Sequence, residues 1–318
     1  MSEITLSVIV PFFNEEANLA KLHKELTEVL GGLNIKSEIV YVDDGSRDHS
    51  KEVLTKEIEK KHFAIKIKIV SFNRNFGQTA AVVAGINNSS GELVSFLDAD
   101  LQNDPHDIPT FLGKMEEGYD AVFGWRKERK DTSLRSFFSR AANKVINMVF
   151  SYPYHDVGCS ARVVKRHFLK DLQLYGELHR IMPVLIYLKG AKIGEIIVTH
   201  RSRAGGQSKY GLERIAKTLI DIISVKFLTA YGTKPAYVFG SLGLASIFVG
   251  CLTLLAVAYR KIFLGVFVHR DPLFLITIFL VLSGIQLVVM GLIAELQVRT
   301  YFESQKKTIY DIGSIKEY

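Results

Sequence analysis

The sequence predicts an α/β protein: a mostly parallel β-sheet with helices on both faces, followed by an amphipathic helix and a two-helix membrane hairpin. Two observations predict this fold class. Apolar runs of strand length alternate with helical patterns through the N-terminal part of the chain, which is typical of parallel strands joined by right-handed crossovers. Farther along, the stretches 236–259 and 273–294 contain no charged residue, and each exceeds the roughly 20 residues needed to cross a bilayer.

The strands are predicted from short apolar runs, which are typical of strands buried on both faces. These runs lie at 6–12, 38–44, 67–72, 92–100 and 120–125. Between them, the spacing of apolar residues predicts helices at 15–30, 47–60, 77–88 and 105–117. Beyond Trp125 the pattern loosens, and we expect a basic helix at 133–150, a strand at 160–164, a helix at 178–189 and a strand at 193–200.

The chain is expected to have a soluble domain at 1–210, an amphipathic helix at 211–234, and a hairpin with a C-terminal tail at 235–318. The amphipathic helix either lies on the bilayer surface or packs on the soluble domain. Lysine and arginine residues flank the hairpin on both sides. The positive-inside rule therefore places the soluble domain and the tail in the cytoplasm, with the chain as a multi-pass protein of the cytoplasmic membrane.

The formal net charge of +7 favours an acidic partner. Nucleic acid is not expected, because no array of basic and aromatic residues and no known nucleic-acid module is present. An anionic lipid surface fits better, since the segment before the hairpin is both basic and amphipathic. Cys159 and Cys251 lie far apart, and no disulfide or zinc spacing exists, which fits a reducing compartment.

Polar residues stand where each of the first four predicted strands ends. These residues are Asn14 and Glu15, Asp43–Asp48, Asn73–Gln78, and Asp98, Asp100 and Gln102. Ligands of open α/β sheets bind at the carboxyl ends of the strands, so these side chains predict a binding crevice. Their oxygens suit Mg²⁺ or Mn²⁺ held jointly with a diphosphate. Capping of the following helix is the alternative role for Asn14, Asp44 and Asp48.

Four motifs in these turns resemble those of the family 2 glycosyltransferases, which have the Rossmann-like GT-A fold. The motifs are Pro-x-x-Asn-Glu at 11–15, Val-Asp-Asp-Gly-Ser-x-Asp at 42–48, Arg-Asn-x-Gly-Gln at 74–78 and Asp-Ala-Asp-Leu-Gln at 98–102. More narrowly, the chain resembles the polyprenyl-phosphate glycosyltransferases, and its two-span hairpin is similar to that of the bacterial bactoprenol glucosyltransferases. The Gln-x-x-Arg-Trp motif of polymer-building family members is missing, so the resemblance implies a single sugar transfer.

The resemblance implies a donor site and a metal site. The positions that match nucleotide-binding residues of the family are Pro11, Glu15, Asp43, Gln78 and Asp98. Asp98 is expected to touch the ribose or a metal-bound water, and the alternative is that it only orients its neighbours. Asp100 and Gln102 match the ligands of Mg²⁺ or Mn²⁺, an ion that offsets the charge gained by a leaving diphosphate.

An acceptor site is implied in the same way. The residues that match acceptor-phosphate positions are Arg126, Arg140 and Lys209, and the implied catalytic set is Asp156, Arg126 and Lys209. A lipid monophosphate is already largely ionised and needs no strong base, so Asp156 acts either as a base or by orienting sugar hydroxyls. His179 either contacts the sugar or the phosphates, or is only a packing or surface residue. One of Arg201 and Arg203 is expected to face the phosphate.

The function implied is inverting transfer of glucose from UDP-glucose to undecaprenyl phosphate at the cytoplasmic membrane face. One alternative keeps the chemistry with mannose, N-acetylglucosamine or an aminoarabinose-type sugar. Another is a non-catalytic scaffold that binds a nucleotide sugar for a lipid-sugar translocator. A homo-oligomer is also expected, because Gly240, Gly243 and Gly250 give the first span a surface suited to helix packing.

Overall fold

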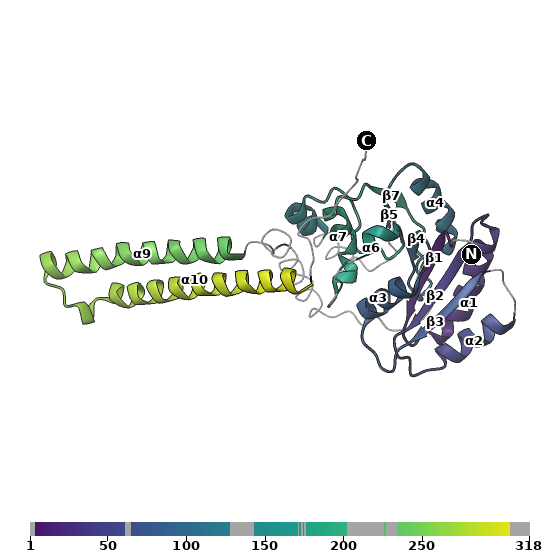
Figure 1. Ribbon diagram of the computed structural model, residues 1–318, viewed down its shortest axis with the longest axis horizontal. Helices are drawn as coiled ribbons and strands as arrows, with labels where there is room; N and C mark the ends of the chain where they lie inside the picture. Colours follow the sequence, from purple (N-terminus) through teal and green to yellow (C-terminus); the bar gives the residue numbers. More distant parts are fainter. Residues whose placement is uncertain are drawn as a thin grey trace. The chain divides into compact units, whose positions relative to one another are not determined.

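The structure is a computed structural model of the 318-residue chain. It describes residues 4–60, 65–127, 143–170, 172, 174, 176–201, 226 and 235–305. The chain divides into two compact units, Met1–Asp221 and Ile222–Tyr318. The first unit is built on a β-sheet and the second on two long helices (Figure 1).

The first unit contains a seven-stranded sheet in the order β3-β2-β1-β4-β6-β5-β7. The strands are β1 (Leu6–Phe12), β2 (Ser37–Asp43), β3 (Lys66–Ser71), β4 (Leu93–Phe96), β5 (Ala121–Trp125), β6 (Arg162–Lys165) and β7 (Ile193–Ile197). All neighbours pair in parallel except β6, which runs antiparallel to both β4 and β5. The prediction of a mostly parallel α/β sheet is therefore confirmed.

Helices connect the strands and cover both faces of the sheet (Figure 1). They are α1 (Glu16–Gly32), α2 (Ser50–Lys60), α3 (Gln78–Asn88), η1 (Pro105–Asp107), α4 (Ile108–Glu116), α6 (Arg166–Leu169), η2 (Leu178–Arg180) and α7 (Met182–Leu188). Residues 143–150 are also helical. α2 begins three residues later than expected, because Asp48 lies outside the helix and its carboxylate accepts a hydrogen bond from the backbone nitrogen of Ser50 at 3.0 Å.

The core lies on both sides of β1, every residue of which is buried. Val8 and Val10 pack with Leu19 and Leu22 of α1 on one face. On the other face, a Cβ atom at Gly85 of α3 would lie 2.3 Å from Ile9, so only glycine allows α3 to approach this closely. Burial on two faces explains why β1 reads as a continuous apolar run.

The order of the strands sets the position of the ligand crevice. The chain moves outward from β1 through β2 to β3, and then returns to place β4 on the opposite side of β1. Open α/β sheets bind ligands at such a switch point, outside the carboxyl ends of the strands. The residues that follow β1 and β4 therefore stand where a ligand is expected.

The opposite edge of the sheet is held by a buried carboxylate. Glu38 accepts hydrogen bonds from Ser7 Oγ at 2.7 Å and Ser90 Oγ at 2.8 Å, and it lies 3.0 Å from Lys68 Nζ. Burial opposes the ionisation of Glu38, but these donors outweigh it and hold its pKa below the ordinary value. The stabilisation is therefore present at neutral pH and is lost as the pH falls through the lowered pKa.

We expect Glu38→Ala to lower the free energy of unfolding by about 3 kcal/mol, because it leaves buried donors without an acceptor. Thermal unfolding of the full chain in detergent measures the change, with Glu59→Ala on the exposed side of α2 as the control. An equal melting temperature for the two variants at pH 7 would contradict the prediction.

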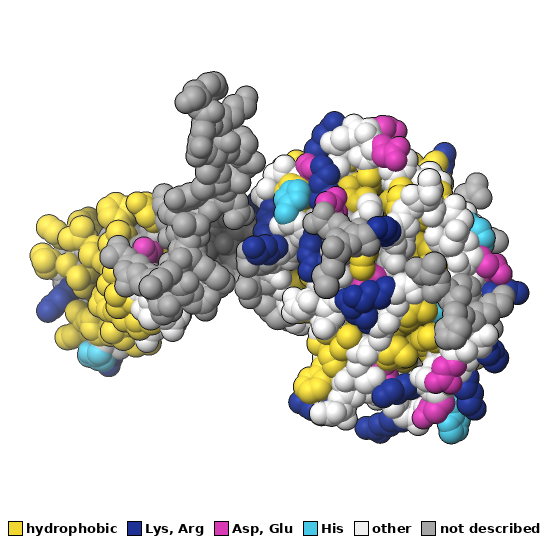
Figure 2. Space-filling model, turned by 45° about the vertical axis from the view of Figure 1, so that its right-hand side comes forward, with side chains coloured by type: hydrophobic (Ala, Val, Ile, Leu, Met, Phe, Trp, Pro, Cys, Tyr) yellow, Lys and Arg dark blue, Asp and Glu magenta, His cyan; other side chains and the backbone are white. Residues whose placement is uncertain are grey.

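The second unit consists of α9 (Pro235–Leu264) and α10 (Pro272–Gln305), joined through the short helix η3 (Val268–Arg270). By length and composition, Pro235–Leu264 and Pro272–Val298 could each cross a membrane, with mean hydropathies of 2.2 and 2.6. On the face in Figure 2, the side chains described in this unit are mostly hydrophobic, whereas the sheet unit mixes charged and uncharged ones. Helices lie at both predicted span positions.

Glycines of the hairpin serve the contact between its own two helices. A Cβ atom at Gly243 would lie 2.6 Å from the backbone oxygen of Gly284, and one at Gly250 would lie 2.8 Å from Val281. Such close backbone approach is what small residues provide between helices in a membrane. Gly243 and Gly250 are thus used within one chain, and they no longer argue for an oligomer. A Cβ atom at Gly240 would meet nothing within 4 Å.

Candidate active site

Hydrogen bonds tie the turn after β1 to the turn after β2. The side chain of Asn14 accepts a bond from the backbone nitrogen of Arg47 at 2.8 Å, and its own backbone nitrogen donates to Ser46 Oγ at 3.0 Å. Asn14 has a positive φ of 57° and precedes Glu15, the residue at the N-cap of α1. Asn14 is therefore not the N-cap of α1; its side chain joins the two turns, and a role in ligand binding stays a prediction.

Asp44 ties the turn after β2 to the turn after β3. Its carboxylate accepts bonds from the backbone nitrogens of Phe76 at 2.8 Å and Gly77 at 3.0 Å, and from Asn75 Nδ2 at 2.9 Å. Burial, aided by the charge of Asp43, raises the pKa of Asp44 despite these donors. Asp44 therefore does not act as a cap for α2; it shapes the loop that leads into α3.

Gly45 allows these two turns to meet. It has a φ of +73°, and a Cβ atom there would lie 2.4 Å from the backbone carbon of Arg74. No other residue type tolerates both the left-handed conformation and this approach. The Asp-Asp-Gly sequence therefore encodes a contact between loops as well as a turn.

The expected donor residues all lie at this edge. Pro11 is buried in β1 beside Val42, and Glu15 accepts a bond from Asn18 Nδ2 at 2.6 Å. Asp43 is buried at the end of β2, where its Oδ1 accepts a bond from the backbone nitrogen of Ser46 at 2.8 Å. The remaining pair is in direct contact: Gln78 Nε2 donates to Asp98 Oδ1 at 2.9 Å.

The turn after β4 carries the expected metal ligands. Asp100 Oδ1 accepts a bond from the backbone nitrogen of Gln102 at 3.2 Å, and Leu101 between them has a positive φ of 60°. Leu101 is 3% exposed and belongs to the hydrophobic core, so its side chain anchors this unusual turn. The oxygens of Asp100 and Gln102 are hard ligands of the kind that Mg²⁺ and Mn²⁺ prefer, and the donor set therefore fits such an ion.

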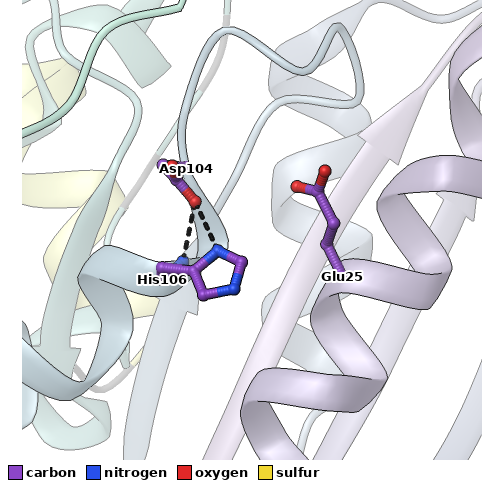
Figure 3. A group of neighbouring side chains, drawn as sticks. All are labelled: Glu25, Asp104 and His106. Atoms are coloured by element: carbon purple, nitrogen blue, oxygen red, sulfur yellow. Dashed lines mark hydrogen bonds and ion pairs between the residues drawn. The ribbon is translucent and has the colours of Figure 1, made fainter.

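A second group of possible metal ligands includes two residues that follow this turn along the chain. Figure 3 shows Glu25 of α1 together with Asp104 and His106. Arg201, which Figure 3 leaves out, lies 2.7 Å from Glu25 Oε2 and 2.6 Å from Asp104 Oδ2. Burial opposes the ionisation of Asp104, but bonds from His106 and Arg201 outweigh it and lower its pKa. The guanidinium already neutralises both acids, and we interpret the group as an ion-pair network.

This network assigns Arg201 a place different from the expected one. Its side chain pairs with two carboxylates, and its backbone nitrogen donates to the backbone oxygen of Gln102 at 2.9 Å. Arg201 thus joins the segment after β7 to the turn that follows β4. Arg203, the other arginine considered for the phosphate, lies outside the described residues, and its contact with the phosphate stays a prediction.

Arg126 and Asp156 form a bidentate ion pair. Arg126 follows β5, and its Nε and Nη2 atoms lie 2.8 Å and 3.0 Å from the two carboxylate oxygens of Asp156. The side chain of Asp156 is 2% exposed, and that of Arg126 is 17% exposed. Planar, two-point pairing fixes the guanidinium in one orientation. Asp156 thus orients Arg126, a contact that the sequence did not predict, and the two roles considered for Asp156 stay predictions.

Two expected acceptor residues, Arg140 and Lys209, lie outside the described residues, as does most of the expected amphipathic helix. The sequence analysis did not identify Thr79 and Arg162, both of which contact His179 near the expected site. Arg162 is 4% exposed in the middle of the sheet, and a basic residue at an inward-facing strand position was the signal that could have identified it.

Comparison with known proteins agrees with this geometry. The model of the family described as "Glycosyl transferase family 2" matches residues 7–173. A dodecaprenyl-phosphate galacturonate synthase of Rhizobium johnstonii is 36% identical over 99% of this chain and 94% of its own length. An undecaprenyl-phosphate 4-deoxy-4-formamido-L-arabinose transferase of Pseudomonas aeruginosa is 35% identical over 98% of this chain and 90% of its own length.

Solved structures support the fold. Glucosyl-3-phosphoglycerate synthase of Mycobacterium tuberculosis, in complex with Mn²⁺, UDP and phosphoglyceric acid, matches with a TM-score of 0.54. The match covers 71% of this chain and 78% of that protein at 17% identity, so it bears on the fold alone. Together with the family model and the full-length relatives, it shows that this chain is an enzyme with the GT-A fold. The chain belongs to glycosyl transferase family 2, among the polyprenyl-phosphate sugar transferases.

Proposed function

We propose that this enzyme transfers one sugar from a nucleotide sugar, with UDP as the leaving group, to the phosphate of a polyprenyl phosphate. The observation that carries the proposal is the match, over nearly the whole chain, to two named polyprenyl-phosphate sugar transferases at 36% and 35% identity. The strand-end residues that this chemistry uses are present and lie together at one edge of the sheet.

The described residues have separate parts in the proposed reaction. Gln78 and Asp98, which contact each other, bind the nucleoside part of the donor. Asp100 and Gln102 would hold Mg²⁺ or Mn²⁺, which offsets the charge of the leaving diphosphate when bound. Arg126, held by Asp156, orients the acceptor phosphate, whose oxygen attacks the anomeric carbon as the bond to UDP breaks. The displacement inverts the configuration at that carbon.

The location follows from the acceptor. A polyprenyl chain keeps its phosphate at the bilayer surface, whereas nucleotide sugars are soluble in the cytosol. The two helices α9 and α10 would anchor the enzyme in the cytoplasmic membrane, with the sheet unit on the cytoplasmic side. Three segments are proposed on this basis: a catalytic domain at 1–210, an interfacial helix at 211–234 and a membrane hairpin with its tail at 235–318.

The identity of the sugar is the finer part of the proposal. Glucose is the sugar implied by the overall resemblance to the bactoprenol glucosyltransferases, and no single residue decides it. The two relatives are named for galacturonate and 4-deoxy-4-formamido-L-arabinose, and both sugars carry an axial substituent at C4, whereas that of glucose is equatorial. The relatives therefore favour a donor with an axial C4 substituent over UDP-glucose.

A transfer assay with the full chain in detergent tests the proposal. Undecaprenyl phosphate is the acceptor, and the donors are labelled UDP-glucose, UDP-galacturonic acid, UDP-N-acetylglucosamine, UDP-4-deoxy-4-formamido-L-arabinose and GDP-mannose. We expect label in the lipid fraction from one donor, and loss of that label in EDTA. Absence of transfer from every donor, in a chain that still binds UDP, would support the scaffold alternative.

A further inference from the structure

Thr79 and His179 form a contact beside the expected donor residues. Thr79 is the second residue of α3 and follows Gln78, whose side chain contacts Asp98. Thr79 Oγ1 lies 2.5 Å from the backbone oxygen of Gly176 and 2.6 Å from His179 Nδ1. The contact therefore joins η2 to the N-terminus of α3, next to the crevice.

These two distances determine the tautomer of His179. A backbone carbonyl only accepts hydrogen bonds, so the single hydroxyl proton of Thr79 is donated to Gly176. Thr79 Oγ1 can then only accept from His179, which means that Nδ1 carries the ring proton. The other ring nitrogen, Nε2, is left with a free lone pair.

The surroundings keep this ring neutral. Burial, together with the positive charges of Arg180 and Arg162, lowers the pKa of His179 to about 3. Arg162 also holds η2 in place, because its Nη1 donates to the backbone oxygen of His179 at 3.3 Å. Its guanidinium lies 5.2 Å from the centre of the Phe96 ring on β4, two residues before Asp98. His179 is therefore fixed in position as well as in protonation state.

The lone pair limits what His179 can bind. Nε2 has no hydrogen-bond partner among the described residues. It is also not one of the fully buried nitrogens without a partner, so a ligand can reach it. An unprotonated nitrogen repels phosphate and carboxylate oxygens, which only accept hydrogen bonds. A ligand at this point must therefore either donate a hydrogen bond or be a metal cation. In a nucleotide sugar the donating groups on either side of the diphosphate are the hydroxyls of the ribose and those of the transferred sugar, and only the second set is absent from UDP.

We propose that His179 binds the donor sugar by accepting a hydrogen bond from one of its hydroxyls at Nε2, and that Thr79 is the positioning residue that sets its tautomer. This inference rests on the proposed sugar transfer. The proposed reaction does not use His179 to bind the diphosphate, the cation or the acceptor phosphate, so the inference assigns this residue a separate role in binding the sugar. It also makes His179 a residue that distinguishes nucleotide sugars from the free nucleotide.

Four variants of the full chain in detergent test the inference. His179→Asn keeps an amide nitrogen near the position of Nδ1 but has no atom at Nε2. His179→Gln restores a polar atom near Nε2. Thr79→Val removes the hydroxyl that sets the tautomer, and Thr79→Ser retains it. Isothermal titration in Mg²⁺ measures the binding of UDP, UDP-glucose and UDP-galacturonic acid to each variant, and the transfer assay gives the KM of the active donor.

For His179→Asn we expect a 10- to 100-fold weaker affinity for the active nucleotide sugar, roughly the effect of one lost hydrogen bond in a closed site, with UDP affinity within about twofold of wild type. Thr79→Val should weaken the same affinity, whereas Thr79→Ser and His179→Gln should retain most of it. Equal weakening of UDP and the nucleotide sugar would overturn the inference in favour of a structural role. A higher Mg²⁺ requirement at unchanged donor affinity would overturn it in favour of metal ligation. Wild-type protein that transfers no sugar would contradict the proposed function instead.

Discussion

Sugar transfer is expected to fall by about 1,000-fold when Asp100 is replaced by alanine, because several kcal/mol of stabilisation of the leaving diphosphate are lost. Asp100 lies in a turn whose backbone is anchored by the buried side chain of Leu101, so removal of the carboxylate should leave the fold intact. The transfer assay with undecaprenyl phosphate measures the loss.

Measurement of UDP binding shows whether Asp100→Ala loses transfer because the cation site is lost or because the protein no longer folds. In the wild-type protein, Mg²⁺ should strengthen UDP binding, and in Asp100→Ala the affinity should no longer depend on the cation. Glu116→Ala, at an exposed carboxylate of α4, is the matched control and should behave as wild type in both measurements. Cation-dependent UDP binding that persists in Asp100→Ala would remove Asp100 from the metal site.

Replacement of Asp156 by asparagine is expected to lower transfer by about 100-fold, the size of effect that a small displacement of a positioned group produces. Asparagine has nearly the shape of aspartate, but it cannot accept at both atoms from Nε and Nη2 of Arg126. The guanidinium would lose its fixed orientation, and with it the proposed contact with the acceptor phosphate. The effect should therefore be seen mainly in the KM for undecaprenyl phosphate, with UDP binding unchanged.

A double-mutant cycle tests whether Asp156 acts through Arg126. Arg126→Ala should cost a similar factor, and the two substitutions together should cost little more than either alone, since each removes the same interaction. A base at position 156 predicts another pattern. Its loss would lower kcat at every acceptor concentration, and that loss would add to the loss from Arg126→Ala.

The sequence predicted the sheet well where the strands are buried on both faces. The strand at 6–12 was located to the residue, because helices cover it on both sides and its apolar run is continuous. The direction of β6 was beyond such reasoning, since apolar periodicity is the same in parallel and antiparallel strands. The start of α2 was missed for a local reason, the hydrogen bond from Ser50 to Asp48.

The candidate site could be predicted in part for a topological reason. Carboxyl ends of parallel strands share one edge, so the proximity of Gln78 and Asp98 followed from the order of strands and helices. Pairs brought together by the antiparallel part of the sheet could not be predicted in this way. Arg126 and Asp156 are thirty residues apart, and the partners of Arg201 come from α1 and from the turn after β4. Spacing along the chain carries no signal for such contacts.

The strained turn at Leu101 has a consequence for movement in this enzyme. A glycine at this position would relieve the backbone, but it would also leave the two neighbouring ligand residues on a hinge. With leucine, the side chain is held in the core, and the turn cannot swing without disrupting the packing beneath it. The turn that carries the proposed cation ligands is therefore expected to keep its conformation while substrates enter and products leave.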